Sequence, residues 1–161
     1  MLFFDQRGHL TPYALIPTDW ETFAGTFGWN QHRLTLIEKL SQFVAQVCAL
    51  PVQTFDIWID GSFVTQKEMP NDLDAVLFIQ SIDHRRFERE IRVLRDTYKE
   101  LDLYVVRKIA ETERDHFLYI SDRTEWMFQF TTTRPDKRIR QKFPKGFVQI
   151  SWPYEQAVKP A

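Results

Sequence analysis

The feature that most constrains the fold is a stretch that is apolar at nearly every position, Leu73–Ile79. A strand with one face in water alternates apolar and polar residues, so a continuous run indicates a strand covered on both faces. Shorter apolar runs at Phe55–Ile59 and Leu101–Val106 precede and follow it. Between Leu73–Ile79 and Leu101–Val106 lies an apolar stripe with helical spacing, formed by Phe87, Ile91, Leu94 and Tyr98. The pattern predicts a mixed α/β (α+β) fold, with a β-sheet of about four to six strands packed with helices.

Capping residues predict where the helices begin. The segment Thr18-Asp19-Trp20-Glu21 is typical of a capping box, with Thr18 as the N-cap of a short helix that ends near Phe27. From Asn30 to Leu50, apolar residues recur every three or four positions, which predicts an amphipathic helix. Ser81 or Asp83 is predicted to cap the helix that carries the apolar stripe.

The two ends of the chain are expected to complete this core. Residues 1–17 contain glycine and prolines between short apolar pieces, which favours an extended arm or hairpin that covers one edge of the fold. After Val106 we predict a helical stretch near 110–120, a strand at Trp126–Thr132, a basic loop and a last strand at Phe147–Ser151. We therefore expect a single domain over residues 1–161, with its core at about 30–106, an N-terminal arm and short helix at 1–29, and C-terminal strands and the basic loop at 107–161.

Composition excludes several classes of protein. The hydrophobic share of 43% and the aromatic share of 15% are unlike those of disordered chains. The 21 Lys and Arg residues against 22 Asp and Glu residues give a net charge of -1, so a polyanionic partner would have to bind a local patch. No apolar stretch approaches the length that spans a bilayer, and the single cysteine, Cys48, is interpreted as a core thiol. We expect a cytoplasmic protein with no membrane partner.

Two short motifs point to phosphate and metal chemistry. Gly61-Ser62 follows an expected strand, and a turn there lets backbone amides and the Ser62 hydroxyl approach a phosphate. Asp72 and Asp74 lie two residues apart, so their side chains project from one face of the next strand. Neighbouring carboxylates repel each other unless a hard cation such as Mg²⁺ lies between them. Asp102, the second residue of the third strand, is the natural third ligand.

These residues resemble the signature of the DNA polymerase β-type nucleotidyltransferase superfamily. The signature is a strand, Gly-Ser or Gly-Gly, a loop, Asp-x-Asp or Asp-x-Glu, and a later strand aspartate, which corresponds to about residues 52–106. The resemblance implies a minimal nucleotidyltransferase fold in which Gly61 and Ser62 hold a nucleoside triphosphate (NTP) and Asp72, Asp74 and Asp102 are catalytic ligands of two Mg²⁺ ions. Asp60-Gly61-Ser62-Phe63, the Gly8 arm and Lys145-Gly146-Phe147 also resemble a bacterial family of small, functionally uncharacterised nucleotidyltransferase-like proteins.

Two functions remain open from the sequence. One is Mg²⁺-dependent transfer of a nucleoside monophosphate from an NTP to a hydroxyl of a protein or RNA acceptor, with no DNA partner predicted. The other is a non-catalytic relative that binds a nucleotide or a partner protein, as an antitoxin-like regulator does. The resemblance implies a bacterial toxin-antitoxin or phage-defence setting, with a partner protein or a homodimer that supplies the acceptor surface.

The basic segment Arg134–Lys145 allows two interpretations. Six of its residues are basic and only Asp136 is acidic, so it can contact nucleotide phosphates or an RNA backbone, or it can be a plain charged loop. Lys145 is its candidate nucleotide-binding residue. The structural alternative for Asp72 and Asp74 is that they cap a turn and solvate the end of a strand.

Overall fold

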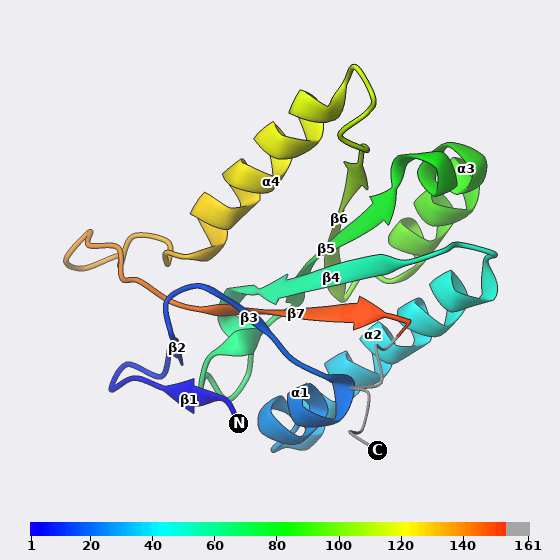
Figure 1. The fold of residues 1–161 in the computed structure, drawn as a ribbon. Coiled ribbons are helices and arrows are strands. Elements are labelled where there is room, and N and C mark those ends of the chain that lie inside the picture. The colour runs from blue at the N-terminus through cyan, green and yellow to red at the C-terminus, as the bar shows by residue number, and fades with distance from the viewer. Residues whose placement is uncertain (154–161) are drawn as a thin grey trace, which may run out of the picture.

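The computed structural model describes residues 1–153 and shows one five-stranded mixed sheet, a small two-stranded sheet and four α-helices (Figure 1). Within residues 1–153, no helix has both the length and the apolar character needed to cross a bilayer. The elements in chain order are β1 (Phe3–Phe4), β2 (Leu10–Thr11), β3 (Leu15–Pro17), α1 (Trp20–Phe27), α2 (Gln31–Ala49), β4 (Phe55–Asp60), the 3₁₀ helix η1 (Gly61–Val64), β5 (Leu73–Gln80), α3 (Ser81–Thr97), β6 (Leu101–Lys108), α4 (His116–Phe130) and β7 (Phe147–Trp152).

The main sheet has the strand order β3-β7-β4-β5-β6. Strand β4 is antiparallel to both of its neighbours, whereas β5 and β6 are parallel and are joined by α3. Because of these directions, the C-terminal end of β4 lies beside the N-terminal starts of β5 and β6. The residues that follow β4 and those that begin β5 and β6 therefore meet at one edge of the sheet.

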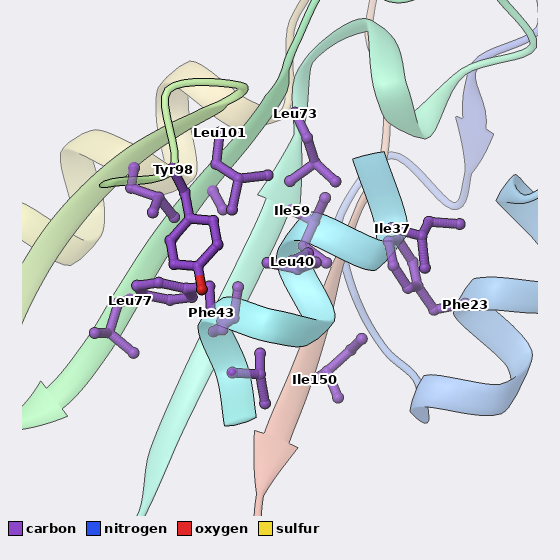
Figure 2. Packing of buried hydrophobic residues seen from close by; sticks show 14 of the residues in the cluster. Phe23, Ile37, Leu40, Phe43, Ile59, Leu73, Leu77, Tyr98, Leu101 and Ile150 are labelled. Carbon is purple, nitrogen blue, oxygen red and sulfur yellow. The ribbon is translucent and has the colours of Figure 1, made fainter. Parts of the chain in front are cut away.

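Helices α1, α2 and α3 cover one face of the sheet and enclose the larger core. Alternate strand residues such as Ile59, Leu77 and Ile150 point to this side and are fully buried. Figure 2 shows them meeting Leu40 and Phe43 of α2, with the Tyr98 ring packed beside Phe43. This burial is the main stabilising contribution to the domain.

Among the helices within residues 1–153, α4 is the one that packs on the opposite face. The strand residues Trp58, Val76 and Phe78 point to this side, and Phe130 of α4 and Phe147 of β7 complete a second, smaller core. The ring centroids of Trp58 and Phe78 are 4.3 Å apart, and those of Phe130 and Phe147 are 5.3 Å apart. The sheet is thus covered on both faces, as the continuous apolar run Leu73–Ile79 predicts.

The structure confirms the mixed α/β class and the strand number within the described residues. It also confirms the helix expected from Asn30, which is the N-cap of α2 and accepts a hydrogen bond from the Arg33 amide. The N-terminal arm forms the β1-β2 pair and then adds β3 to the sheet edge beside β7. Residues 154–161, the end of the predicted C-terminal region, lie outside the described residues.

The predicted strand at Trp126–Thr132 is wrong, because Trp126–Phe130 forms the last turns of α4. Aromatic residues favour strands locally, but here tertiary packing decides the conformation. Tyr119, Trp126, Met127 and Phe130 recur at helical spacing and pack against the second core. The predicted helical stretch near 110–120 likewise begins later, at His116.

Three smaller predictions also fail. Asp19, rather than Thr18, caps α1 and accepts from the Thr22 amide at 2.7 Å. Helix α3 begins without a side-chain cap, because Ser81 is already helical and the Asp83 carboxylate accepts from the Gln53 amide of another segment. Cys48 is exposed on the outer face of α2 rather than in the core.

Candidate active site

The strand pairing brings three aspartates into one row on the α4 side of the sheet. Asp60 is the last residue of β4 and stands opposite Asp74 of β5, which in turn stands opposite Asp102 of β6. All three share a strand face with Trp58, Val76 and Tyr104, since side chains alternate along a strand. Leu73 points to the other face and is fully buried in the larger core, as the sequence predicts.

Asp72, Asp74 and Asp102 form a cluster that can hold a metal ion. Each offers a carboxylate oxygen, and these three oxygens lie within 4.8 Å of one another. An all-carboxylate set of this kind suits a hard cation such as Mg²⁺. The structure therefore brings together the three acidic residues that the sequence singled out.

The cluster is electrostatically unfavourable without a cation. Burial raises the pKa of Asp74 to about 7, and the nearby carboxylates of Asp72, Asp102 and Asp60 add to the shift. Like charges close together disfavour ionisation, whereas a bound divalent cation favours it. Near neutral pH, the cluster is thus prepared to exchange a proton for a metal ion.

Gly61 lies directly against this cluster. Its φ of +73° belongs to the left-handed region, and a Cβ built at this position would lie 1.8 Å from the Asp74 Oδ2 atom. Only glycine fits both conditions. Ser62 follows in η1, and its hydroxyl has no hydrogen-bond partner among the described residues, so it is available to a ligand.

Asp60 forms a buried ion pair behind the cluster. Its Oδ1 accepts from the Lys145 Nζ at 2.5 Å, and both residues are 5% exposed. Burial raises the pKa of Asp60 to about 6 even against the attraction of Lys145. The structure therefore places Lys145 at the site, but with its ammonium group bound to Asp60.

Arg33 of α2 holds the loop that connects Gly61-Ser62 to Asp72. Its fully buried guanidinium donates to the carbonyls of Phe27, Phe63, Thr65 and Lys67. Burial lowers its pKa to about 10, at which it remains charged at neutral pH. The loop is thereby fixed from the side of the larger core.

A cleft of about 740 Å³ opens beside the acidic residues. Asp60, Asp74 and Asp102 line one side together with the Gly61-Ser62 turn. Asp72 and several uncharged polar residues also line the cleft. Its aromatic lining residues are Tyr104, Trp126, Phe128 and Phe130, and its basic ones include Lys67, Arg134 and Lys142. Carboxylates for a metal, a Gly-Ser turn and basic groups for phosphates are thus combined in one cavity.

Four residues of this region were missed by sequence reasoning. Asp60 directly precedes Gly61, and Tyr104 follows Asp102 by two positions, so strand alternation was a usable signal for both. Trp126 and Arg33 carried no such signal, because their positions depend on the packing of α4 and α2.

Comparison with protein families matches residues 2–151 to a family of unknown function, DUF6932, and the chain belongs to that family. No curated protein and no solved structure matches the chain.

Proposed function

We propose that this protein is a Mg²⁺-dependent nucleotidyltransferase that transfers a nucleoside monophosphate from an NTP to a hydroxyl of a protein or RNA. The observation that carries the proposal is the convergence of the Asp72, Asp74 and Asp102 carboxylates beside the Gly61-Ser62 turn. The basic residues that line the same cleft support it, because a triphosphate needs cationic partners beyond the metal.

Each group has a defined task in this reaction. The three carboxylates would hold Mg²⁺, which neutralises phosphate charge and activates the attacking hydroxyl when bound. The Ser62 hydroxyl and the backbone of the turn would orient the triphosphate. The acceptor oxygen then forms a bond to the α-phosphorus, the bond to the bridging oxygen breaks, pyrophosphate leaves with that electron pair, and the hydroxyl proton passes to water. Positioning and charge neutralisation supply the catalysis, without a covalent intermediate on the protein.

Transfer of radiolabel from α-labelled NTPs to total RNA and protein tests this function. We expect Mg²⁺-dependent labelling by the wild type and a loss of at least about a hundredfold in Asp72→Asn/Asp74→Asn, because the metal loses two ligands. Asp96→Asn/Asp122→Asn removes two exposed carboxylates from α3 and α4 and serves as the matched control. Undiminished transfer by the first double variant would exclude this active site.

One observation favours a non-catalytic alternative, a nucleotide- or partner-binding regulator of the antitoxin type. The Lys145 ammonium is held by Asp60, so it does not reach toward a phosphate in this conformation. Calorimetry with all four NTPs and Mg²⁺, together with the labelling assay, separates the two functions. An enzyme binds an NTP and transfers label, a nucleotide-binding regulator binds an NTP without transfer, and a partner-binding regulator binds none of the four. Either function is compatible with a role in a cytoplasmic bacterial toxin-antitoxin or phage-defence system, in which the protein acts with a partner protein or as a homodimer.

A further inference from the structure

A basic hairpin, which we call the arm, connects α4 to β7 and spans Thr131–Lys145. Backbone hydrogen bonds join its two limbs, from the Thr133 amide to the Phe143 carbonyl at 2.8 Å and from the Lys145 amide to the Thr131 carbonyl at 2.9 Å. In Figure 1 the arm is the orange segment that projects from the sheet beyond the C-terminal end of α4. The Arg7 guanidinium stacks over the Phe143 ring at 3.8 Å and so braces the arm from the N-terminal hairpin.

The arm carries a local positive charge that no ion pair with the rest of residues 1–153 neutralises. Five of its basic residues are exposed, and none of them forms an ion pair within residues 1–153: Arg134, Lys137, Arg138, Arg140 and Lys142. Its one acidic residue, Asp136, accepts from the backbone amides of Arg138 and Ile139 to form the tip. In the basic helix α3, acidic residues interleave with the arginines along the sequence, and Arg92 pairs with Glu88 and Arg95 with Asp96.

The arm leads directly into the aromatic part of the cleft. Arg134 and Lys142 line the cleft together with Tyr104, Trp126 and Phe128. Tyr104 is 42% exposed, and its ring packs against that of Trp126 with centroids 4.7 Å apart and an angle of 49° between the ring planes. Phe128 is 70% exposed at the same cleft. Basic residues and exposed aromatic residues therefore line the same cleft.

We propose that the arm and the Tyr104 ring form a binding surface for single-stranded nucleic acid. Unpaired cations bind successive phosphates, and exposed aromatic rings stack on unpaired bases. A duplex keeps its bases stacked internally, whereas a single strand presents unpaired bases to exposed aromatic rings and phosphates to the unpaired cations, so the combination favours a single strand. The inference concerns binding and does not require catalysis. If the proposed transferase activity holds, the bound strand is its acceptor, and its end lies at the acidic cluster.

Fluorescence anisotropy with labelled RNA and DNA oligonucleotides of roughly 12 nucleotides tests the proposal. We expect the wild type to bind at low salt, with an affinity that falls steeply as salt is added. The variant Lys137→Gln/Arg138→Gln/Arg140→Gln should bind on the order of a hundredfold more weakly at low salt, and its log-log salt slope should be shallower by about 2. Comparison of the affinities for RNA and for DNA identifies which polynucleotide is preferred.

Two matched controls separate the arm from general charge. Arg85→Gln/Arg86→Gln/Arg89→Gln removes the same number of exposed positive charges from α3 and should leave binding close to that of the wild type. Tyr104→Leu should weaken binding on the order of tenfold with an unchanged salt slope, whereas Tyr104→Phe, which keeps the ring, should not.

The proposal is overturned if the wild type binds neither RNA nor DNA, if the arm and α3 variants lose affinity equally, or if only an acidic protein binds the arm. Binding by Asp72→Asn/Asp74→Asn distinguishes this inference from the proposed function. That variant retains the arm, so it should bind the oligonucleotide even though it transfers no label.

Discussion

At Gly61 the backbone has room for a hydrogen atom and nothing larger. The left-handed φ of +73° brings its α-carbon against the Asp74 carboxylate, which itself faces Asp102 across the strand pair. The glycine therefore does more than form a turn. Its missing side chain allows the Gly61-Ser62 turn and the acidic cluster to lie in direct contact.

Replacing Gly61 with alanine should disrupt the site. The new methyl group would overlap Asp74 Oδ2, so the carboxylate must turn away, and we expect weaker Mg²⁺ binding and a loss of about 1–3 kcal/mol in unfolding free energy. Calorimetric Mg²⁺ titration and urea denaturation measure the two effects. Gly25→Ala is the control, because within residues 1–153 no atom other than the adjoining residues and the backbone of its own helix lies within 4 Å of the added Cβ, and it should be neutral or stabilising by about 0.4–1 kcal/mol. Equal Mg²⁺ affinity in wild type and Gly61→Ala would contradict this role.

At the scale of elements, the start of α2 holds the loop between the two motifs. Asn30 donates to the Glu68 carbonyl at 2.8 Å, a His32 ring nitrogen lies in hydrogen-bond contact with the Pro70 carbonyl, and Arg33 binds the earlier carbonyls. Three side chains from one helix end thus support a segment whose regular structure is limited to the short 3₁₀ helix η1. The amphipathic pattern that predicts α2 does not indicate that the start of this helix also supports the loop.

Arg33→Met should strongly destabilise the protein, because it leaves several buried carbonyls without donors. We expect a loss of more than about 3 kcal/mol in unfolding free energy, measured by chemical denaturation. Thr35→Ala on the same helix removes an exposed hydroxyl that bonds only to the Gln31 carbonyl and should cost less than about 0.5 kcal/mol. Similar losses in the two variants would show that the guanidinium contacts are of little energetic value.

At the scale of the whole molecule, the raised pKa values at the acidic site lower the free energy of unfolding at neutral pH. The folded protein raises the pKa of Asp74 to about 7 and that of Asp60 to about 6, from an ordinary value of 3.8. Between about pH 4 and pH 7 the folded state therefore binds more protons at these groups than the unfolded state does. Their contribution to stability decreases as pH rises through that window.

A pH series of unfolding free energies tests this linkage. From about pH 5 to pH 8 the wild type should lose stability relative to Asp74→Asn, since the asparagine cannot ionise. Burial lowers the pKa of His9 and of His84, and this makes stability increase with pH. Both proteins contain these histidines, so the difference between the proteins isolates the contribution of Asp74. Added Mg²⁺ should restore stability to the wild type at pH 8 and not to the variant. A pH-independent difference between the proteins would contradict the raised pKa of Asp74.

Local patterns were sufficient for much of the fold and for part of the site. Continuous apolar runs marked β4 and β5, helical spacing marked α2 and α3, and a two-residue step placed Asp72 and Asp74 together. The same local information failed at Trp126–Phe130, where aromatic residues suit either a strand or a helix. There the choice depends on whether they can pack against Trp58 and Phe147, which lie far away in the chain.

The sequence by itself determined the mixed α/β class and the acidic and Gly-Ser motifs, because strand alternation and glycine backbone freedom act over a few neighbouring residues. Only the tertiary structure decided that Asp60 pairs with Lys145, 85 positions away, that Arg33 supports the loop, and that the arm continues the aromatic cleft. Such contacts join residues distant in the chain, and their geometry follows from the order and direction of strands in the sheet.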